Sequence, residues 1–311
     1  MIEHFEPKAP SAPREMQHYT SQPKGAPAGS HGKRGFLRLG FERDATNRTI
    51  LRDWERRVPL IVQQALYFDE ELPDMACVYI LSSGGPNVDG DRYEQIISLG
   101  RGSAVHLSTG AATKLAEMRF NYSAMRQTIR LDAEAYMEYL PEPMIPCRHT
   151  RYISDTRIVI DASATLIYAD TYLPGRRFYD SGEIFHYDVL SIVTHAERPS
   201  GEALFREKFI IRPDISHPHE AGAMGGFDIF ANVILLTPED VANDIYASTE
   251  AFYRPAEGLA AGITRLPSAC GLQYKVLGND SGEVKRLIRE FASSVRLRVK
   301  QRPLPQDFPW R

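Results

Sequence analysis

The chain has few cysteines, and their spacing gives no sign of pairing. Its 311 residues include three cysteines, Cys77, Cys147 and Cys270, which is an odd number with wide gaps. A disulfide-based scaffold normally carries an even number of cysteines at short spacings. The pattern therefore favours buried free thiols in a reducing cytoplasm over a disulfide-stabilised extracellular fold.

Long apolar segments and an excess of positive charge are also missing. The apolar run at residues 229–236 is far shorter than the roughly 18 residues that a membrane helix needs. Residues 1–34 contain no apolar signal segment. The 37 Lys and Arg residues against 40 Asp and Glu residues give a net charge of -3, whereas a general nucleic-acid binder is usually basic. We therefore expect a cytoplasmic protein that binds neither membranes nor nucleic acid.

The chain lacks the motifs of nucleotide binding and of hydrolysis. Residues 109–114 (TGAATK) look like a phosphate-binding loop, but such a loop needs Gly-Lys-Ser/Thr and a glycine five positions earlier. Here Thr113 precedes Lys114, and Leu115 follows where a magnesium-binding hydroxyl is required. Neither a Gly-x-Ser-x-Gly elbow nor a His-Glu-x-x-His helix is present. Glu138 and Glu142 are close in sequence, but such pairs are common without an acid–base role. We expect no enzymatic activity.

What the chain does have is an ordinary globular composition behind a polar start. Hydrophobic residues make up 43% and charged residues 25%, which is enough for a packed core. Residues 1–34 are rich in proline, glycine and serine and cannot bury enough surface to offset the entropy of ordering. We predict a disordered tail over residues 1–34, a single β domain over residues 35–300 and a tail over residues 301–311.

Strand patterns dominate the predicted domain. Short runs that alternate apolar and polar residues, rich in β-branched and aromatic side chains, recur about every ten residues without intervening helices. Strands are predicted at residues 36–41, 49–54, 76–81, 95–99, 104–108, 127–131, 136–140, 157–160, 165–169, 187–193 and 203–211. The spacing favours stacked or wrapped antiparallel sheets over βαβ units, so the fold class is mostly β.

Two helices are predicted near the C-terminal part. The first begins around Thr237-Pro238-Glu239-Asp240, where a capping oxygen, a proline and acidic residues occur in order, and its apolar side is predicted to continue to Phe252 and Tyr253. The second begins after Ser281-Gly282-Glu283. Its apolar stripe consists of Val284, Leu287, Ile288, Phe291 and Val295, and its other side carries Lys285, Arg286, Arg289, Arg296 and Arg298. We expect this basic side to be solvated, and a partner-docking surface is the alternative.

Two groups of side chains could bind a metal ion. Cys147 and His149 would lie on the same face of a strand, and His217 and His219 flank a proline in a glycine-rich segment. Thiol and imidazole groups suit Ni²⁺ or Zn²⁺. A structural site normally has four such ligands, which neither group supplies. A buried cysteine and a solvated loop are therefore the simpler interpretations.

Several motifs together resemble one known family. Residues 103–114 (SAVHLSTGAATK), 136–143 (YMEYLPEP), 172–176 (YLPGR) and Gly182-Glu183 occur in the order found in the urease accessory protein called D or H, and the resemblance covers roughly residues 35–300. It implies a β-helix-like arrangement of two stacked layers. It also implies a metallochaperone scaffold that passes nickel along a water-filled tunnel into apo-urease. Partners would be apo-urease, the F-type accessory protein and, through that protein, the G-type GTPase.

The resemblance also suggests which carboxylates could contact nickel in transit. Asp91 and Glu183 match motif positions of the family, and Asp89 and Asp188 lie near them. We expect no tightly bound cofactor, because a conduit that binds its cargo tightly does not release it. Two alternatives stay open: a cupin-like metal-dependent enzyme that uses His217, His219 and Cys147, and a structural adaptor that never contacts nickel.

Overall fold

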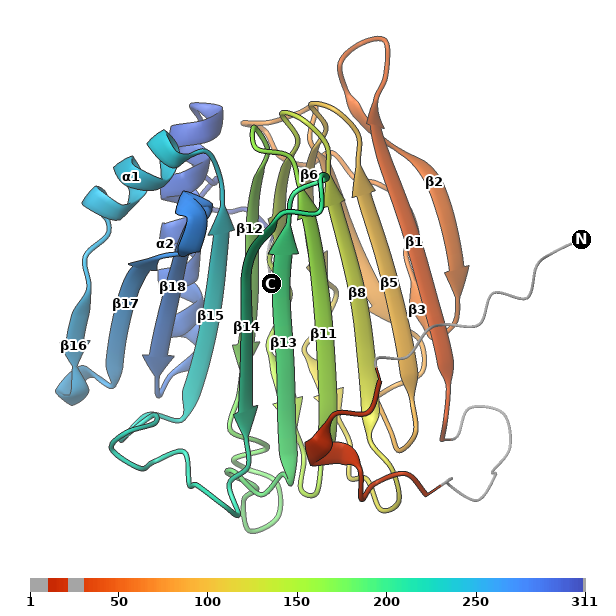
Figure 1. Cartoon of the computed structure of the whole chain (residues 1–311), viewed down its shortest axis with the longest axis vertical. Helices are drawn as coiled ribbons and strands as arrows, with labels where there is room; N and C mark the ends of the chain where they lie inside the picture. Colours follow the sequence, from red (N-terminus) through yellow and green to blue (C-terminus); the bar gives the residue numbers. More distant parts are fainter. Residues whose placement is uncertain (1–10, 22–30, 310–311) are drawn as a thin grey trace, which may run out of the picture.

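The protein, seen in a computed structural model that describes residues 11–21 and 31–309, consists of two facing β-sheets (Figure 1). The seven-stranded sheet has the order β14 (Ala203–Ile211), β13 (Val189–Glu197), β11 (Arg151–Ile160), β8 (Ser123–Leu131), β5 (Arg92–Leu99), β1 (Arg34–Arg43) and β2 (Thr49–Arg57). The eleven-stranded sheet has the order β16 (Phe252–Arg254), β17 (Leu259–Arg265), β18 (Gly271–Gly278), β15 (Ile229–Leu236), β12 (Thr165–Tyr172), β9 (Tyr136–Tyr139), β6 (Ala104–Thr109), β4 (Ala76–Ser82) and β3 (Leu60–Ile61), with β10 (Met144–Pro146) and β7 (Thr113–Leu115) paired beside β12.

Successive strands alternate between the two sheets. β4, β6, β9 and β12 belong to the eleven-stranded sheet, while β5, β8, β11 and β13 belong to the other, and within each set the neighbours are parallel. This confirms the β-helix-like two-layer prediction, and each predicted strand overlaps an observed one. The expectation of antiparallel pairing was wrong for these strands. Alternation in sequence shows which side chains face inward, but it does not reveal the direction of a neighbouring strand.

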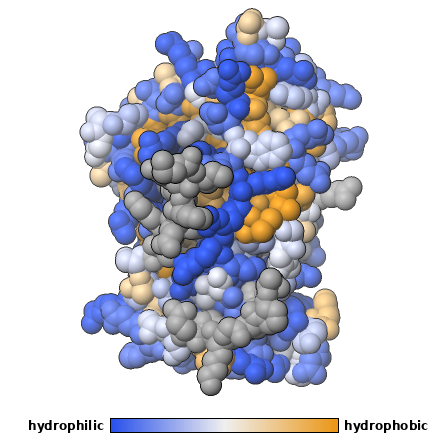
Figure 2. Space-filling view, turned by 90° about the vertical axis from the view of Figure 1, so that its right-hand side faces the viewer, coloured by the Kyte–Doolittle hydropathy of each residue, from blue (hydrophilic) through white to orange (hydrophobic). Residues whose placement is uncertain are grey.

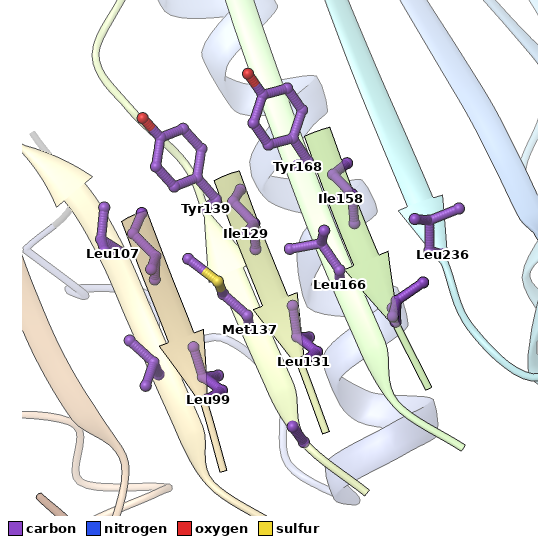
Figure 3. Close-up of a cluster of buried hydrophobic side chains, with 14 of the residues drawn as sticks. Leu99, Leu107, Ile129, Leu131, Met137, Tyr139, Ile158, Leu166, Tyr168 and Leu236 are labelled. Atoms are coloured by element: carbon purple, nitrogen blue, oxygen red, sulfur yellow. The ribbon is translucent and has the colours of Figure 1, made fainter. Parts of the chain in front are cut away.

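The main core lies between the sheets. Leu99, Leu131 and Ile160 occupy matching positions on neighbouring parallel strands and are essentially unexposed. Met137 and Leu166 face them from the other sheet, as Figure 3 shows for this cluster. Burying each such aliphatic side chain contributes about 1.5–3 kcal/mol to stability. The period-two pattern read from the sequence thus corresponds to the inner faces of the two layers.

The two predicted helices are present and cover one part of the eleven-stranded sheet (Figure 1). α1 spans Glu239–Ser248, and α2 spans Ser281–Lys300 with a hydrogen bond from the Glu283 amide to the Asp280 carboxylate at its start. The predicted apolar stripe of α2 is buried, and the Phe291 ring stacks on Tyr274. Phe252 and Tyr253 belong to β16 rather than to α1, so that part of the prediction was wrong. No helix in the described part of the chain is both long and apolar enough to cross a bilayer.

Arg296 corrects the expectation of a fully solvated basic side on α2. Its side chain is completely buried, forms an ion pair with Asp69 and lies 3.7 Å from Glu138, measured from Nη1 to Oε1. Glu138 also contacts His106 Nδ1 at 2.8 Å and accepts a hydrogen bond from the Tyr136 hydroxyl at 2.7 Å. Burial opposes ionisation of Glu138, but His106 and Arg296 together hold its pKa below the ordinary value. The helix is thus attached to the sheet by a buried charge cluster as well as by apolar packing.

Glu142, the other half of the carboxylate pair considered above, also binds α2. Its carboxylate lies 2.6 Å from the Lys285 ammonium group. Glu138 and Glu142 therefore contact separate positions of the same helix.

Parts of both terminal segments pack against the domain. Residues 14–16 form a short 3-10 helix whose Met16 is fully buried, so the prediction of disorder over residues 1–34 was wrong for residues 11–21; residues 1–10 and 22–30 lie outside the described residues. In the C-terminal segment, Leu304 and Phe308 are buried in the cluster beneath α2. Three short 3-10 helices are described in all, at Arg14–Met16, Pro255–Glu257 and Pro267–Ala269.

Replacing Arg296 by alanine should strongly destabilise the fold, since Asp69 and Glu138 would remain buried without their cation. We expect the free energy of unfolding in urea to fall by about 3–5 kcal/mol. Arg298→Ala on the same helix is the matched control, because its ion pairs with Asp240 and Asp244 are exposed, and it should change stability by less than about 1 kcal/mol. Equal effects of the two substitutions would contradict the structural role given to the buried cluster.

Candidate functional site

The four carboxylates chosen from the sequence lie along one edge of the seven-stranded sheet. Asp89 and Asp91 precede β5, and Glu183 and Asp188 precede β13. Backbone hydrogen bonds connect the turns along this edge, from the Ala124 amide to the Asp91 carbonyl and from the His149 amide to the His186 carbonyl. Parallel strands place their starts together, which explains why residues almost a hundred positions apart come to the same edge.

Asp89 and Asp91 are buried and fully engaged in holding turns. Asp91 accepts hydrogen bonds from the Lys33 and Val88 amides and the Tyr93 hydroxyl, and its Oδ2 lies 2.9 Å from Lys33 Nζ. Asp89 accepts three backbone amides, those of residues 119–121, at 2.6–2.9 Å. A cation would have to displace these donors to reach either carboxylate.

Glu183 and Asp188 are each paired with an arginine. Arg176 binds Glu183 through two parallel contacts of 2.6 and 2.7 Å, and this hydrogen bonding lowers the pKa of Glu183. Gly175 makes the pairing possible, because its φ of +136° favours glycine and a Cβ there would lie 2.1 Å from the Glu183 carbonyl oxygen. Asp188 accepts a hydrogen bond from Arg151 Nε at 2.7 Å, and its carboxylate lies 3.0 Å from His149 Nδ1. The Asp188 side chain is 24% exposed. Asp188 is therefore the most accessible of the four.

The thiol and imidazole groups do not converge on a metal-binding geometry. Cys147 and His149 lie in a turn after β10 rather than on a strand, and His149 has a positive φ. Burial raises the pKa of the Cys147 thiol. The rings of His217 and His219 pack against Phe185, and His219 Nε2 lies 2.8 Å from Asp228. Among residues 11–21 and 31–309, no group of three or more His, Cys, Asp or Glu side chains is arranged to hold a metal ion.

A row of polar side chains that the sequence patterns did not predict lies between the sheets. Five inward-facing residues occupy matching positions on adjacent strands of the seven-stranded sheet: Gln95, Gln127, Thr156, Thr194 and Glu207. On the opposite sheet the matching row consists of Asp170, Asn232 and Lys275. We call these eight residues the polar layer. It separates the large aliphatic cluster from a second cluster that contains Tyr152, Tyr172 and Leu190.

The residues of the polar layer interact with one another and with tyrosine hydroxyls. Gln127 donates to Gln95 at 2.8 Å, and Thr156 Oγ1 lies 3.1 Å from the Tyr168 hydroxyl. Figure 3 shows Tyr139 and Tyr168 at one end of the aliphatic cluster with their hydroxyls directed away from it. Burial raises the pKa of Asp170 to about 7, and the hydroxyls of Tyr168 and Tyr172 partly oppose this shift. Asp170 is nevertheless partly accessible to solvent.

The two ends of the polar layer lie near different parts of the molecular surface. On one side Gln95 lines a hollow of about 390 Å³ together with residues 109–114, the segment that looks like a phosphate-binding loop. Figure 2 shows that the β1–β2 side of the molecule carries exposed apolar surface among hydrophilic areas. At the other end the Glu207 carboxylate lies 2.6 Å from the Lys275 ammonium group and accepts hydrogen bonds from the Asn232 and Gln273 side-chain amides. The Lys275 side chain is 42% exposed. The layer thus extends across the interior between two accessible regions.

Comparisons with known proteins point to one family. Residues 33–311 match the family profile described as "UreD urease accessory protein". The chain is 43% identical over 297 residues to "Urease accessory protein UreD 2" of Brucella canis and of Brucella suis, which covers 96% of this chain and 98% of each relative. It is 39% identical over 297 residues to "Urease accessory protein UreD" of Yersinia pseudotuberculosis, covering 96% of this chain and 92% of the relative.

The Glu183–Arg176 pair should make stability depend on pH in a defined direction. Because the folded state lowers the pKa of Glu183 from its ordinary 4.5, its contribution is present above that value and is lost as the pH falls through the folded-state pKa. Glu183→Gln should therefore destabilise the protein more at pH 7 than at about pH 3.5 in urea unfolding. Glu55→Gln, in an exposed pair with Arg38, should show little effect at either pH. A Glu183→Gln effect that does not change with pH would contradict this assignment.

Proposed function

Because the chain belongs to the UreD family of urease accessory proteins, we propose that it is a non-catalytic metallochaperone scaffold that guides Ni²⁺ into apo-urease during maturation. Its partners are apo-urease and the F-type accessory protein, and through the latter the G-type GTPase. In this proposal the GTPase, and not this chain, binds the nucleotide. Residues 109–114 of this chain accordingly lack the Gly-Lys-Ser/Thr sequence that binds nucleotide phosphates. The proposal places the protein in the cytoplasm, where the three free, buried cysteines would stay reduced.

The observation that carries the proposal is the polar layer. Its groups are amide, hydroxyl and carboxylate oxygens on facing strands, together with the Lys275 ammonium group. Such oxygen ligands are weaker for Ni²⁺ than clustered imidazoles or thiolates, so an ion could exchange between them without being trapped. We therefore propose that nickel transits as cargo along this layer and that the protein holds no resident cofactor.

Asp170 and Glu207 are the proposed principal carboxylates of this route. Asp170 has hydroxyl partners rather than an arginine, so its charge is not already neutralised by a fixed cation. Glu207 is bound to Lys275, which is itself partly exposed. These two groups could take up a cation at a lower energetic cost than carboxylates held in bidentate arginine pairs.

The edge carboxylates keep a secondary place in the proposal. Asp91, Glu183, Asp89 and Asp188 are proposed as transient contacts near the start of the strands, with Asp188 the most accessible. If they act, activation of urease should fall in an Asp91→Ala, Glu183→Ala double variant whose complex with the partners still assembles. Normal activation with normal assembly would remove Asp91 and Glu183 from the route.

Substitution of the interior carboxylates should slow nickel delivery without preventing assembly. With apo-urease and the F-type and G-type accessory proteins present, Asp170→Asn and Glu207→Gln should each lower the rate of urease activation by about tenfold, equivalent to ~1.4 kcal/mol in the barrier to transfer. Urease-bound nickel is measured together with activity, and pull-down checks the complex. Deletion of the whole protein should leave urease folded but without nickel.

Glu202→Gln is the matched control, since this exposed residue lies on the same β13–β14 hairpin as Glu207. With this variant the rate of urease activation should equal that measured with the unmodified chain. If Asp170→Asn and Glu207→Gln also activate normally in intact complexes, the protein is an adaptor that does not contact nickel, and the conduit proposal fails.

A further inference from the structure

The described part of the N-terminal segment lies across the outer face of the seven-stranded sheet. Figure 1 shows it, in red, in front of the lower ends of the strands around β8 and β11. The backbone amides of Met16 and Tyr19 donate hydrogen bonds within the segment, to the Pro13 and Met16 carbonyls. The segment is therefore attached to the sheet mainly by side chains, as a bound peptide would be, rather than as an added strand.

Met16 is the central anchor of this segment. Its side chain is fully buried, and it packs in a cluster with Tyr122, Ala124, Ile153 and Val189 from the starts of β8, β11 and β13. An unbranched, flexible methionine fills such an irregular apolar site well. The sheet residues by themselves would form an apolar depression on a face that otherwise carries charged side chains.

Polar anchors flank the methionine on both sides. The Glu15 carboxylate accepts a hydrogen bond from the Ser191 hydroxyl and lies 2.8 Å from Lys208 Nζ, with only 8% of the Glu15 side chain exposed. The Arg151 guanidinium lies over the Tyr19 ring at 4.1 Å from its centroid. Further along, the Asn121 side-chain amide donates to the Ser21 carbonyl. Acidic, apolar and aromatic side chains at positions 15, 16 and 19 each have their own complementary partner.

We propose that this surface is a peptide-docking groove, occupied in cis by residues 13–21, that accepts a partner protein's segment of the same Glu-Met-x-x-Tyr chemistry. The groove consists of the Met16 cluster residues on the sheet together with Ser191, Lys208 and Arg151. Complementarity of charge and shape at three consecutive anchors defines the ligand: an acidic residue, an unbranched apolar residue directly after it, and an aromatic ring three residues further on. The chain's own segment competes with that ligand and lowers its apparent affinity in proportion to cis occupancy.

The test uses a fluorescent peptide of residues 11–21 and the full-length Met16→Asp variant, in which the intramolecular segment should be released. The peptide should bind this variant saturably, and it should bind the unmodified chain at least about tenfold more weakly because the groove is already occupied. Hydrogen exchange at residues 15–19 verifies release in the variant. A chain lacking residues 1–21 provides a second empty groove and should bind the peptide equally well.

Matched peptides establish that the proposed anchors determine binding. A Met16→Asp peptide should lose binding, whereas a His18→Ala peptide should bind normally, because His18 is exposed. Failure of the peptide to bind either chain with a released segment, or equal binding of the Met16→Asp peptide, would overturn the proposal. A concentration-dependent dimer of the unmodified chain that dissociates on Met16→Asp substitution would instead assign the groove to a second copy's segment and contradict occupancy in cis.

Discussion

The structure depends on one geometric constraint. Because successive strands belong to opposite sheets, each strand must place every second side chain against the sheet that faces it. At most levels this requirement is met by aliphatic residues such as Leu99 and Leu166, which pack together without polar partners. At one level it is met by the polar layer, whose members must bind one another because bulk water cannot surround them. Thr156 and Tyr168, and Gln95 and Gln127, satisfy this requirement. The aliphatic packing between the two sheets is thereby interrupted by one row of polar side chains.

Carboxylates in the protein differ in whether a fixed cation neutralises them. Glu183 with Arg176, and Glu138 with His106 and Arg296, have fixed partners that neutralise them and hold loops or helices in place. Asp170 instead has hydroxyl partners, and its raised pKa reflects the cost of placing a charge between the sheets. A divalent cation near Asp170 would relieve that cost, while near Glu183 it would compete with an existing ion pair. This difference is why the interior carboxylates are the principal contacts of the proposed route and the edge carboxylates are secondary ones.

Alternation in the sequence predicted the strands and the inward-facing residues of segments such as 95–99, and it predicted the apolar stripe of α2 that begins at Val284. It could not predict parallel pairing, because the direction of a neighbour is set by long-range packing. Asp170 escaped notice because the predicted strand stopped at residue 169, one position short of it. Glu207 lies between Arg206 and Lys208, a charged run that is typical of a solvent-facing strand. Arg296 follows Val295 on a helix that otherwise shows a regular basic side, and only the packed structure reveals its burial.

The most direct test of the account measures whether small cations can reach the polar layer. Asp170→Cys and Leu166→Cys place a thiol on the same inward face of β12, one in the polar layer and one in the aliphatic cluster, and the native thiols Cys77, Cys147 and Cys270 are buried. A small cationic methanethiosulfonate reagent should label the Asp170→Cys variant at least about tenfold faster than the Leu166→Cys variant, because thiol reactivity follows exposure and thiolate character. Equal, slow labelling of both variants would show that the layer is closed to cations and would contradict a nickel route between the sheets.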